Sequence, residues 1–259
     1  MRYSLLGSSL LTLVLSLMPP IHADQSAAPD HTLAVISSTG LKAVLDELLP
    51  EFEHTTGYKV AVKYGPSAAL KQQIEQGAPF DLVVLTPAFI EDLIRQGSVV
   101  PDSKHSIARA GMAIAVRAGA QRPDIRTTNA LTRTLLEAKS IAYAKQGAGG
   151  IYFAALTDRL KIAERLTSKS RPTETGDQVA HAVAAGEAEL GILPLSEILP
   201  VPQIEVLGPF PPEVQDYAVM VGGVGAHATD AAAAKKLIAF LTAPGAVAVI
   251  ERKGMELVK

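Results

Sequence analysis

The chain has 259 residues, 48% of them apolar, which is enough to bury the core of one large domain or of two lobes. Lys and Arg total 24 and Asp and Glu total 26, with both signs interspersed, so a nucleic-acid partner is not expected. Cysteine is absent, which excludes disulfides, thiolate metal sites and a cysteine nucleophile. The composition is that of a globular protein.

Residues 1–23 predict a cleaved signal peptide. Arg2 gives a positive start, a mostly apolar run follows over residues 5–18, and Ala23 supplies a small residue at the end. The apolar run is shorter than the roughly 20 residues that a membrane-spanning helix needs. We therefore expect a mature protein that begins at Asp24 and is located in the periplasm.

Strands and helices alternate in the first part of the chain. Apolar, β-prone runs predict strands over residues 32–36, 58–64 and 81–85. Apolar residues at helical spacing predict a helix over 41–49, ended by Pro50, a second containing Leu70 and Ile74, and a third over 89–96. This alternation favours a parallel α/β sheet.

The rest of the chain continues the pattern. Strands are expected over residues 112–116, 140–143, 190–193 and 217–221. Helices are expected over 151–160, from 177 through 183, and over 230–241 and 244–253. We interpret the glycine-rich segment 147–150 as a loop and the proline-rich stretch 200–212 as a surface connection.

Four predicted loops place Ser, Thr or Gly at the start of a helix. They contain Ser38 and Thr39, then Ser67, then Gly149 and Gly150, then Gly176. The first backbone N–H groups of a helix are free to bind an anion, and the helix dipole favours one there. The same residue types are also ordinary helix caps and turn residues. In open α/β sheets, however, ligands bind beyond the carboxyl ends of the strands, where these loops lie.

The sequence resembles the periplasmic molybdate-binding protein family over nearly the whole mature chain. The segments that carry the resemblance are Ser-Thr at 38–39, TGYKV at 56–60, YGPSAAL at 64–70, QIEQGAPFD at 73–81, GGIY at 149–152 and GEAELGI at 186–192. The resemblance implies a two-lobed type II periplasmic binding protein fold of the α/β class. Each lobe would be a mainly parallel sheet flanked by helices, with the ligand cleft between the lobes. Lobe I would comprise residues 24–108 plus 218–259, and lobe II residues 109–217.

The resemblance also implies which residues bind the ligand. In the family, Ser hydroxyls, backbone N–H groups and a Tyr hydroxyl hold the oxyanion. The matching and neighbouring positions here are Ser38, Thr39, Gly40, Tyr64, Ser67, Ala68, Gly149, Gly150, Tyr152 and Gly176. The chain departs from the family pattern at Pro194, which stands where the family has its Tyr, and at Pro66, which removes a backbone donor beside Ser67.

Two functions remain open at this point. One is a substrate receptor of an ABC transporter permease that binds a small anion, namely molybdate, tungstate or an organic polycarboxylate. The other is aconitate isomerase, which shares this scaffold and interconverts trans- and cis-aconitate by an allylic proton shift. A receptor needs tight binding and no base, whereas an isomerase needs a titrating group in the cleft.

The isomerase hypothesis needs a group that removes and returns a proton. The candidates are Asp177, Glu174, Glu197, Tyr64 and Tyr152, of which we prefer Asp177 as a helix-start carboxylate beside the cleft. Lys42, Lys63, Lys145 or Arg109 could supplement the binding of a polycarboxylate. The six histidines lack metal-ligand spacing, so neither a metal nor a cofactor is expected, and a monomer is expected.

Overall fold

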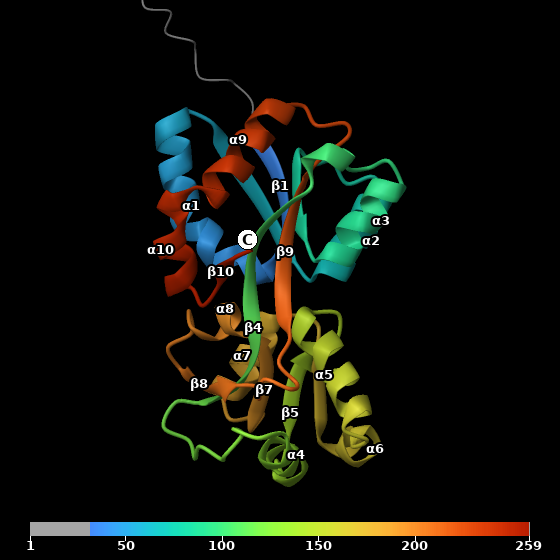
Figure 1. Cartoon of the computed structure of the whole chain (residues 1–259), viewed down its shortest axis with the longest axis vertical. Coiled ribbons are helices and arrows are strands. Elements are labelled where there is room, and N and C mark those ends of the chain that lie inside the picture. Colours follow the sequence, from blue (N-terminus) through green and yellow to red (C-terminus); the bar gives the residue numbers. More distant parts are fainter. Residues whose placement is uncertain (1–31, 259) are drawn as a thin grey trace, which may run out of the picture.

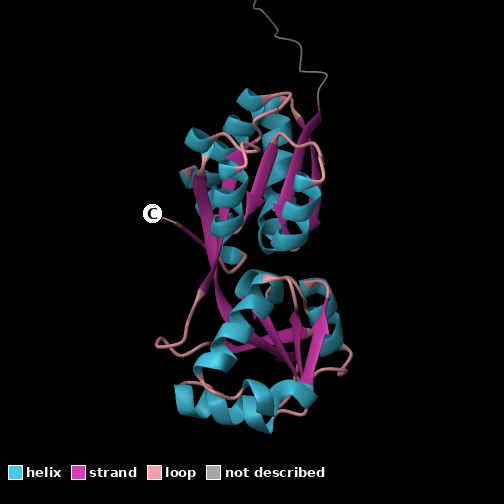
Figure 2. Ribbon diagram, turned by 90° about the vertical axis from the view of Figure 1, so that its right-hand side faces the viewer, coloured by secondary structure: helices cyan, strands magenta, loops and turns pink. Residues whose placement is uncertain are grey.

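Two lobes joined by two long strands make up the computed structural model, which describes residues 32–258 (Figures 1 and 2). The predicted signal peptide and residues 24–31 lie outside the described residues. Each lobe has a sheet flanked by helices, so the predicted two-lobed α/β fold is confirmed.

The first lobe, at the top of Figure 1, is built on three parallel strands, β1 (Thr32–Ser38), β2 (Lys59–Gly65) and β3 (Leu82–Leu85). The returning strand β9 (Tyr217–Val224) pairs antiparallel with β3. The helices of this lobe are α1 (Lys42–Thr56), α2 (Ser67–Glu75), α3 (Pro87–Arg95), α9 (Ala231–Thr242) and α10 (Pro244–Arg252), with short 3-10 turns η1 (Thr39–Leu41) and η2 (Pro101–Ser103).

The second lobe repeats this plan. Its parallel strands are β5 (Ile141–Ala144), β6 (Ser170–Thr173) and β7 (Leu190–Pro194). The antiparallel strand β8 (Ile204–Pro209) completes the sheet through β4. The helices are α4 (Thr128–Glu137), α5 (Ala148–Arg159), α6 (Ala163–Leu166), α7 (Gly176–Ala184) and α8 (Leu195–Ile198), with the 3-10 turn η3 (Thr167–Lys169).

Strand β4 (His105–Arg117) belongs to both sheets. Its first part pairs with β9 and with the short β10 (Glu256–Leu257), and its second part pairs with β7 and β8. The change of partners falls between Gly111 and Met112. The lobe boundaries expected at residues 109 and 217 stay a prediction.

Several expected helix and strand bounds were wrong, and some elements were not predicted. Helix α1 does not end at Pro50 but continues to Thr56, because Phe52 extends its buried face, and it stops at Gly57 with φ of 77°. The stretch 200–212 is not simply a surface connection, since it contains β8. The segment 147–150 is not a loop, because α5 already begins at Ala148. Both α4 and β6 were missed.

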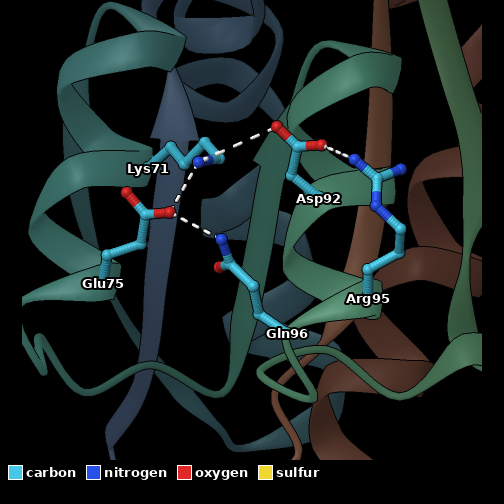
Figure 3. A network of polar contacts seen from close by, with 5 residues as sticks. All are labelled: Lys71, Glu75, Asp92, Arg95 and Gln96. Carbon is cyan, nitrogen blue, oxygen red and sulfur yellow. Dashed lines mark hydrogen bonds and ion pairs between the residues drawn. The ribbon is translucent and has the colours of Figure 1, made fainter.

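A polar network on the outside of the first lobe joins α2 to α3 (Figure 3). Glu75 accepts hydrogen bonds from Lys71 at 2.6 Å and from Gln96 at 2.7 Å, and Asp92 lies between Lys71 and Arg95. Exposed ion pairs of this kind contribute little each. Beneath the network, Leu70 of α2 is fully buried, and this packing holds α2 in place.

Within residues 32–258, no single helix is both long and apolar enough to cross a membrane. The consecutive helices α9 and α10 meet those criteria only when taken together, and they are bent by 66° relative to each other.

Asp81, just before β3, ties the first lobe together. Its buried carboxylate accepts hydrogen bonds from the backbone N–H groups of Ala34 at 2.8 Å and Thr229 at 2.6 Å. Replacing Asp81 by Ala leaves these donors buried without the carboxylate, so we expect Asp81→Ala to lower the free energy of unfolding by about 3 kcal/mol. Urea denaturation measures the loss. The matched exposed change, Asp102→Ala, should cost under about 0.5 kcal/mol, and equal losses for the two variants would contradict this role.

Candidate functional site

The loops that follow the parallel strands of the two lobes face each other and enclose a small cavity. The first lobe contributes Ser38, Thr39, Pro66, Ser67 and Met220. The second lobe contributes, among others, Ala144, Gly147, Gly149, Gly176 and Glu197. These loops follow β1, β2, β5, β6 and β7, so both sheets point their carboxyl ends at one place. The cavity has a volume of about 10 Å³, enough for a single water molecule, so a larger ligand enters only when the lobes separate.

Three helices begin at this cavity, one from the first lobe and two from the second. They are α2, α5 and α7, and each is at least nine residues long. Their first intrahelical hydrogen bonds run from Leu70 to Pro66, from Ile151 to Gly147 and from Val179 to Thr175. The N–H groups of the residues that precede Leu70, Ile151 and Val179 in each helix have no acceptor within their own helix. These free N–H groups and the helix dipoles give the cavity wall a positive potential.

The start of α7 is fixed locally by its sequence. Thr175 and Gln178 form a capping box, in which the Thr175 side chain accepts from the Gln178 N–H and the Gln178 side chain accepts from the Thr175 N–H. This arrangement satisfies the donor of the third helical residue. The donors of the first two, Gly176 and Asp177, are left at the cavity end of the helix.

Two glycines of the cavity wall have close neighbours at the place where a side chain would begin. A Cβ atom on Gly149 would lie 2.4 Å from the carbonyl oxygen of Ile192, which is backbone and cannot move away easily. A Cβ atom on Gly176 would lie 1.8 Å from Oε2 of Glu197. The glycines therefore allow the β7 backbone and the Glu197 carboxylate to approach the helix starts directly.

Glu197 is the one ionisable side chain among the residues that line the cavity. It lies on α8, is partly buried, and accepts a hydrogen bond from Thr39 Oγ1 of the other lobe at 3.4 Å. Burial, and after it the negative charge of Asp177, raise the pKa of Glu197 to about 7, while the hydrogen bond from Thr39 opposes both effects. A carboxyl group with this pKa can both bind and release a proton near neutral pH.

A second hydrogen bond joins the lobes beside Glu197. Ser196 Oγ donates to the carbonyl oxygen of Gly40 at 2.9 Å, and both residues are buried. The α8 segment thus presses against η1 through two neighbouring side chains. These contacts hold the lobes together over the cavity and must break when a ligand enters.

The ten predicted ligand-binding residues fall into three groups. Ser38, Thr39, Ser67, Gly149 and Gly176 line the cavity. Gly40, Ala68 and Gly150 directly follow Thr39, Ser67 and Gly149 in the chain and are not part of the lining. Tyr64 and Tyr152 are directed elsewhere.

The hydroxyl groups of the two tyrosines are already engaged. Tyr64 donates to Asp46 Oδ1 at 3.0 Å, and burial together with the Asp46 charge raises the pKa of Tyr64 above its usual value. Tyr152 is buried against Phe210 and donates to the carbonyl oxygen of Val214 at 2.5 Å. Neither hydroxyl faces the cavity, which argues against both tyrosines as ligand-binding or proton-transferring groups.

The preferred catalytic candidate, Asp177, has an exposed side chain and does not line the cavity. It is close enough to raise the pKa of Glu197 by its charge. Among the acids considered, Glu197 is therefore the one placed at the cavity. Its position could not be read from the sequence, because α8 is only four residues long and follows a strand whose end was expected near residue 193.

The basic residues considered for ligand binding are not at the cavity. Lys42 pairs with Asp46, and Arg109 pairs with Glu256 at 2.7 Å and lies over the ring of Tyr217. Lys63 and Lys145 are exposed. The cavity thus offers neutral donors in place of cations. No group of three His, Asp or Glu side chains within residues 32–258 is arranged to hold a metal ion.

The fold agrees with three comparisons to known proteins. The chain is 31% identical over 236 residues to an aconitate isomerase from Pseudomonas sp, covering 89% of this chain and 90% of that protein. It is 28% identical over 260 aligned residues to the molybdate-binding protein ModA of Azotobacter vinelandii, covering 96% and 98%. The structure of the periplasmic molybdate-binding protein of Azotobacter vinelandii superposes with a TM-score of 0.75 at 23% identity, covering 88% and 100%.

These similarities define the class as a type II periplasmic binding protein fold, as the sequence resemblance predicted. The family model for bacterial extracellular solute-binding proteins matches residues 33–256. The chain belongs to this family.

The pKa of Glu197 predicts how stability depends on pH. Between its usual value of 4.5 and about 7, the folded protein holds a proton that the unfolded chain has released, so stability falls as the pH rises through this window. Glu197→Gln removes this titration. As the pH rises from 5 to 8, the free energy of unfolding of the variant should therefore increase by up to about 3 kcal/mol relative to that of the wild type. Thermal unfolding at both pH values measures it.

The exposed variant Glu187→Gln serves as the control and should follow the wild-type pH profile. Parallel profiles for Glu197→Gln and the wild type would show that Glu197 titrates normally.

Proposed function

We propose that this protein is exported to the periplasm and is the substrate receptor of an ABC transporter that binds a small multiply charged anion between its lobes. The observation that carries this proposal is the convergence of the α2, α5 and α7 N-termini, from both lobes, on one cavity. Such termini bind anions through backbone N–H groups without a cation. The family membership supports the same role.

Binding would couple to lobe closure. Donors from the first lobe, such as Ser67, and from the second lobe, such as Gly149, would reach one anion only when the lobes are closed. The direct contacts between Thr39 and Glu197 and between Ser196 and Gly40 would open to admit the anion and stabilise the lobes when they close again. Candidate ligands are molybdate, tungstate and organic polycarboxylates. We further propose that the protein acts as a monomer and presents its closed form to a membrane permease.

The proposal is tested by titrating the mature protein with molybdate, tungstate, citrate and trans-aconitate, using thermal shift and calorimetry. We expect at least one anion to raise the melting temperature. Ser67→Ala removes a cavity hydroxyl and should weaken that binding about tenfold, since a hydrogen bond to a charged group contributes about 1.5 kcal/mol or more.

Ser168→Ala, an exposed change in the second lobe, is the matched control and should bind as the wild type does. The receptor proposal fails if none of the four anions binds. The assignment of the site fails if Ser67→Ala and Ser168→Ala bind equally well.

A second candidate function, aconitate isomerase, is favoured by the position of Glu197. The reaction removes a proton from the methylene carbon of trans-aconitate, shifts the double bond, and returns a proton to the former vinyl carbon, with no net change in composition. A carboxyl group with a pKa of about 7 at the ligand cavity suits both steps. The similarity to the Pseudomonas sp enzyme supports this candidate as well.

Proton NMR of the mature protein with trans-aconitate tests the second candidate. If the protein is an isomerase, cis-aconitate forms, and Glu197→Gln should lower the rate at least 100-fold, as loss of a general base does. Asp177→Asn should keep most of the rate, because its side chain is exposed and outside the cavity. No turnover by the wild type excludes the isomerase, and loss of turnover in Asp177→Asn alone would assign the base to Asp177.

A further inference from the structure

Glu197 differs chemically from everything else at the cavity. Apart from apolar side chains, the wall otherwise presents backbone N–H groups at the helix starts, which only donate, and the hydroxyls of Ser38, Thr39 and Ser67, which donate or accept. An ionised carboxylate only accepts. The cavity therefore combines many donors for a negative ligand with one group that repels negative charge and requires a donor.

The Glu197 carboxylate lies against Gly176, the first residue of α7. Its Oε1 atom accepts from Thr39 Oγ1, and its Oε2 atom lies 1.8 Å from the position that a Cβ on Gly176 would take. A ligand oxygen that approaches the donors of α7 must therefore lie beside Glu197. Two oxygens in such contact are compatible only if a proton lies between them, and that proton must come from the ligand when Glu197 is ionised.

We propose, on the basis of the anion-binding function above, that Glu197 is the specificity-determining residue of the site. It makes the cavity select a small polycarboxylate that carries a hydroxyl group over one that lacks it and over a fully deprotonated oxyanion. The carboxylates of such a ligand meet the helix N-termini, and its hydroxyl donates to Glu197. A site built to bond a ligand hydroxyl discriminates against the analogue without it, because its own polar group is then left unpaired.

Pro194 supports the same preference for a ligand that carries a hydroxyl group. It is the N-cap residue of α8, three residues before Glu197, and stands where the resemblance to the molybdate-binding family places a Tyr. Proline offers neither a hydroxyl nor an N–H group. Position 194 therefore supplies no donor, and the α8 segment presents the Glu197 carboxylate to the cavity, which suits a ligand that donates there.

A matched pair of ligands tests the proposal. Citrate and tricarballylate carry the same three carboxylates and differ only in the hydroxyl group of citrate. Calorimetry at pH 8, where Glu197 is largely ionised, should show the wild type binding citrate at least tenfold more tightly than tricarballylate, and molybdate more weakly still.

Glu197→Gln supplies the variant arm of the test. The Gln amide can donate to a ligand oxygen, so the preference for citrate should fall below about threefold and molybdate binding should strengthen at least tenfold. Asp177→Asn changes a nearby charge outside the lining and should keep the preference for citrate.

The outcomes separate this proposal from the one on which it rests. Equal wild-type affinity for citrate and tricarballylate overturns the role of Glu197 and leaves anion binding intact, and that comparison requires no variant to fold. An unchanged preference in Glu197→Gln also overturns it. If the wild type binds none of the three anions, the proposed function itself fails and this inference fails with it.

Discussion

The donors at the starts of α2, α5 and α7 determine what the space between the lobes can hold. A helix leaves its first N–H groups outside its own bonding, and burying such groups unpaired is costly. In this protein the starts of three helices point at one small cavity, two of them from the second lobe and one from the first. Closure of the lobes therefore requires an acceptor in the cavity, and this requirement links the fold directly to anion binding.

Glu197 is an acceptor that the protein itself supplies to the closed cavity. Its carboxylate meets Thr39 across the lobe boundary and lies against the start of α7. Burial and the negative charge of Asp177 make the charged form costly, while the hydrogen bond from Thr39 favours it. The group is thus balanced between its two protonation states near neutral pH. A ligand competes with the Glu197 carboxylate for the donors of the cavity. Its affinity therefore depends on the groups by which it differs from a carboxylate.

Local patterns predicted the alternating strands and helices and five of the thirteen residues that line the cavity, whereas the two lobes were implied by the resemblance to the molybdate-binding family. Strand and helix periodicity placed β1, β2, β3 and β7, and Ser38, Thr39, Ser67, Gly149 and Gly176 followed from helix starts after strands. Glu197 was named only as one of several acids, since its approach to Gly176 depends on how two helices from separate segments pack. The tyrosines failed for the same reason. Whether Tyr152 faces a cavity or the carbonyl of Val214 depends on residues 62 positions apart.

The position of the ligand and its chemical identity depend on different parts of this protein. The strand ends and helix starts set the position and sign of the ligand, and they are fixed by backbone geometry that many sequences satisfy. The identity of the ligand depends on the few side chains that enter the cavity. Pro194, where the resemblance places a Tyr, ends β7, and Glu197 follows on the four-residue α8. The side-chain chemistry that we propose to select the ligand therefore lies within one short segment of the chain.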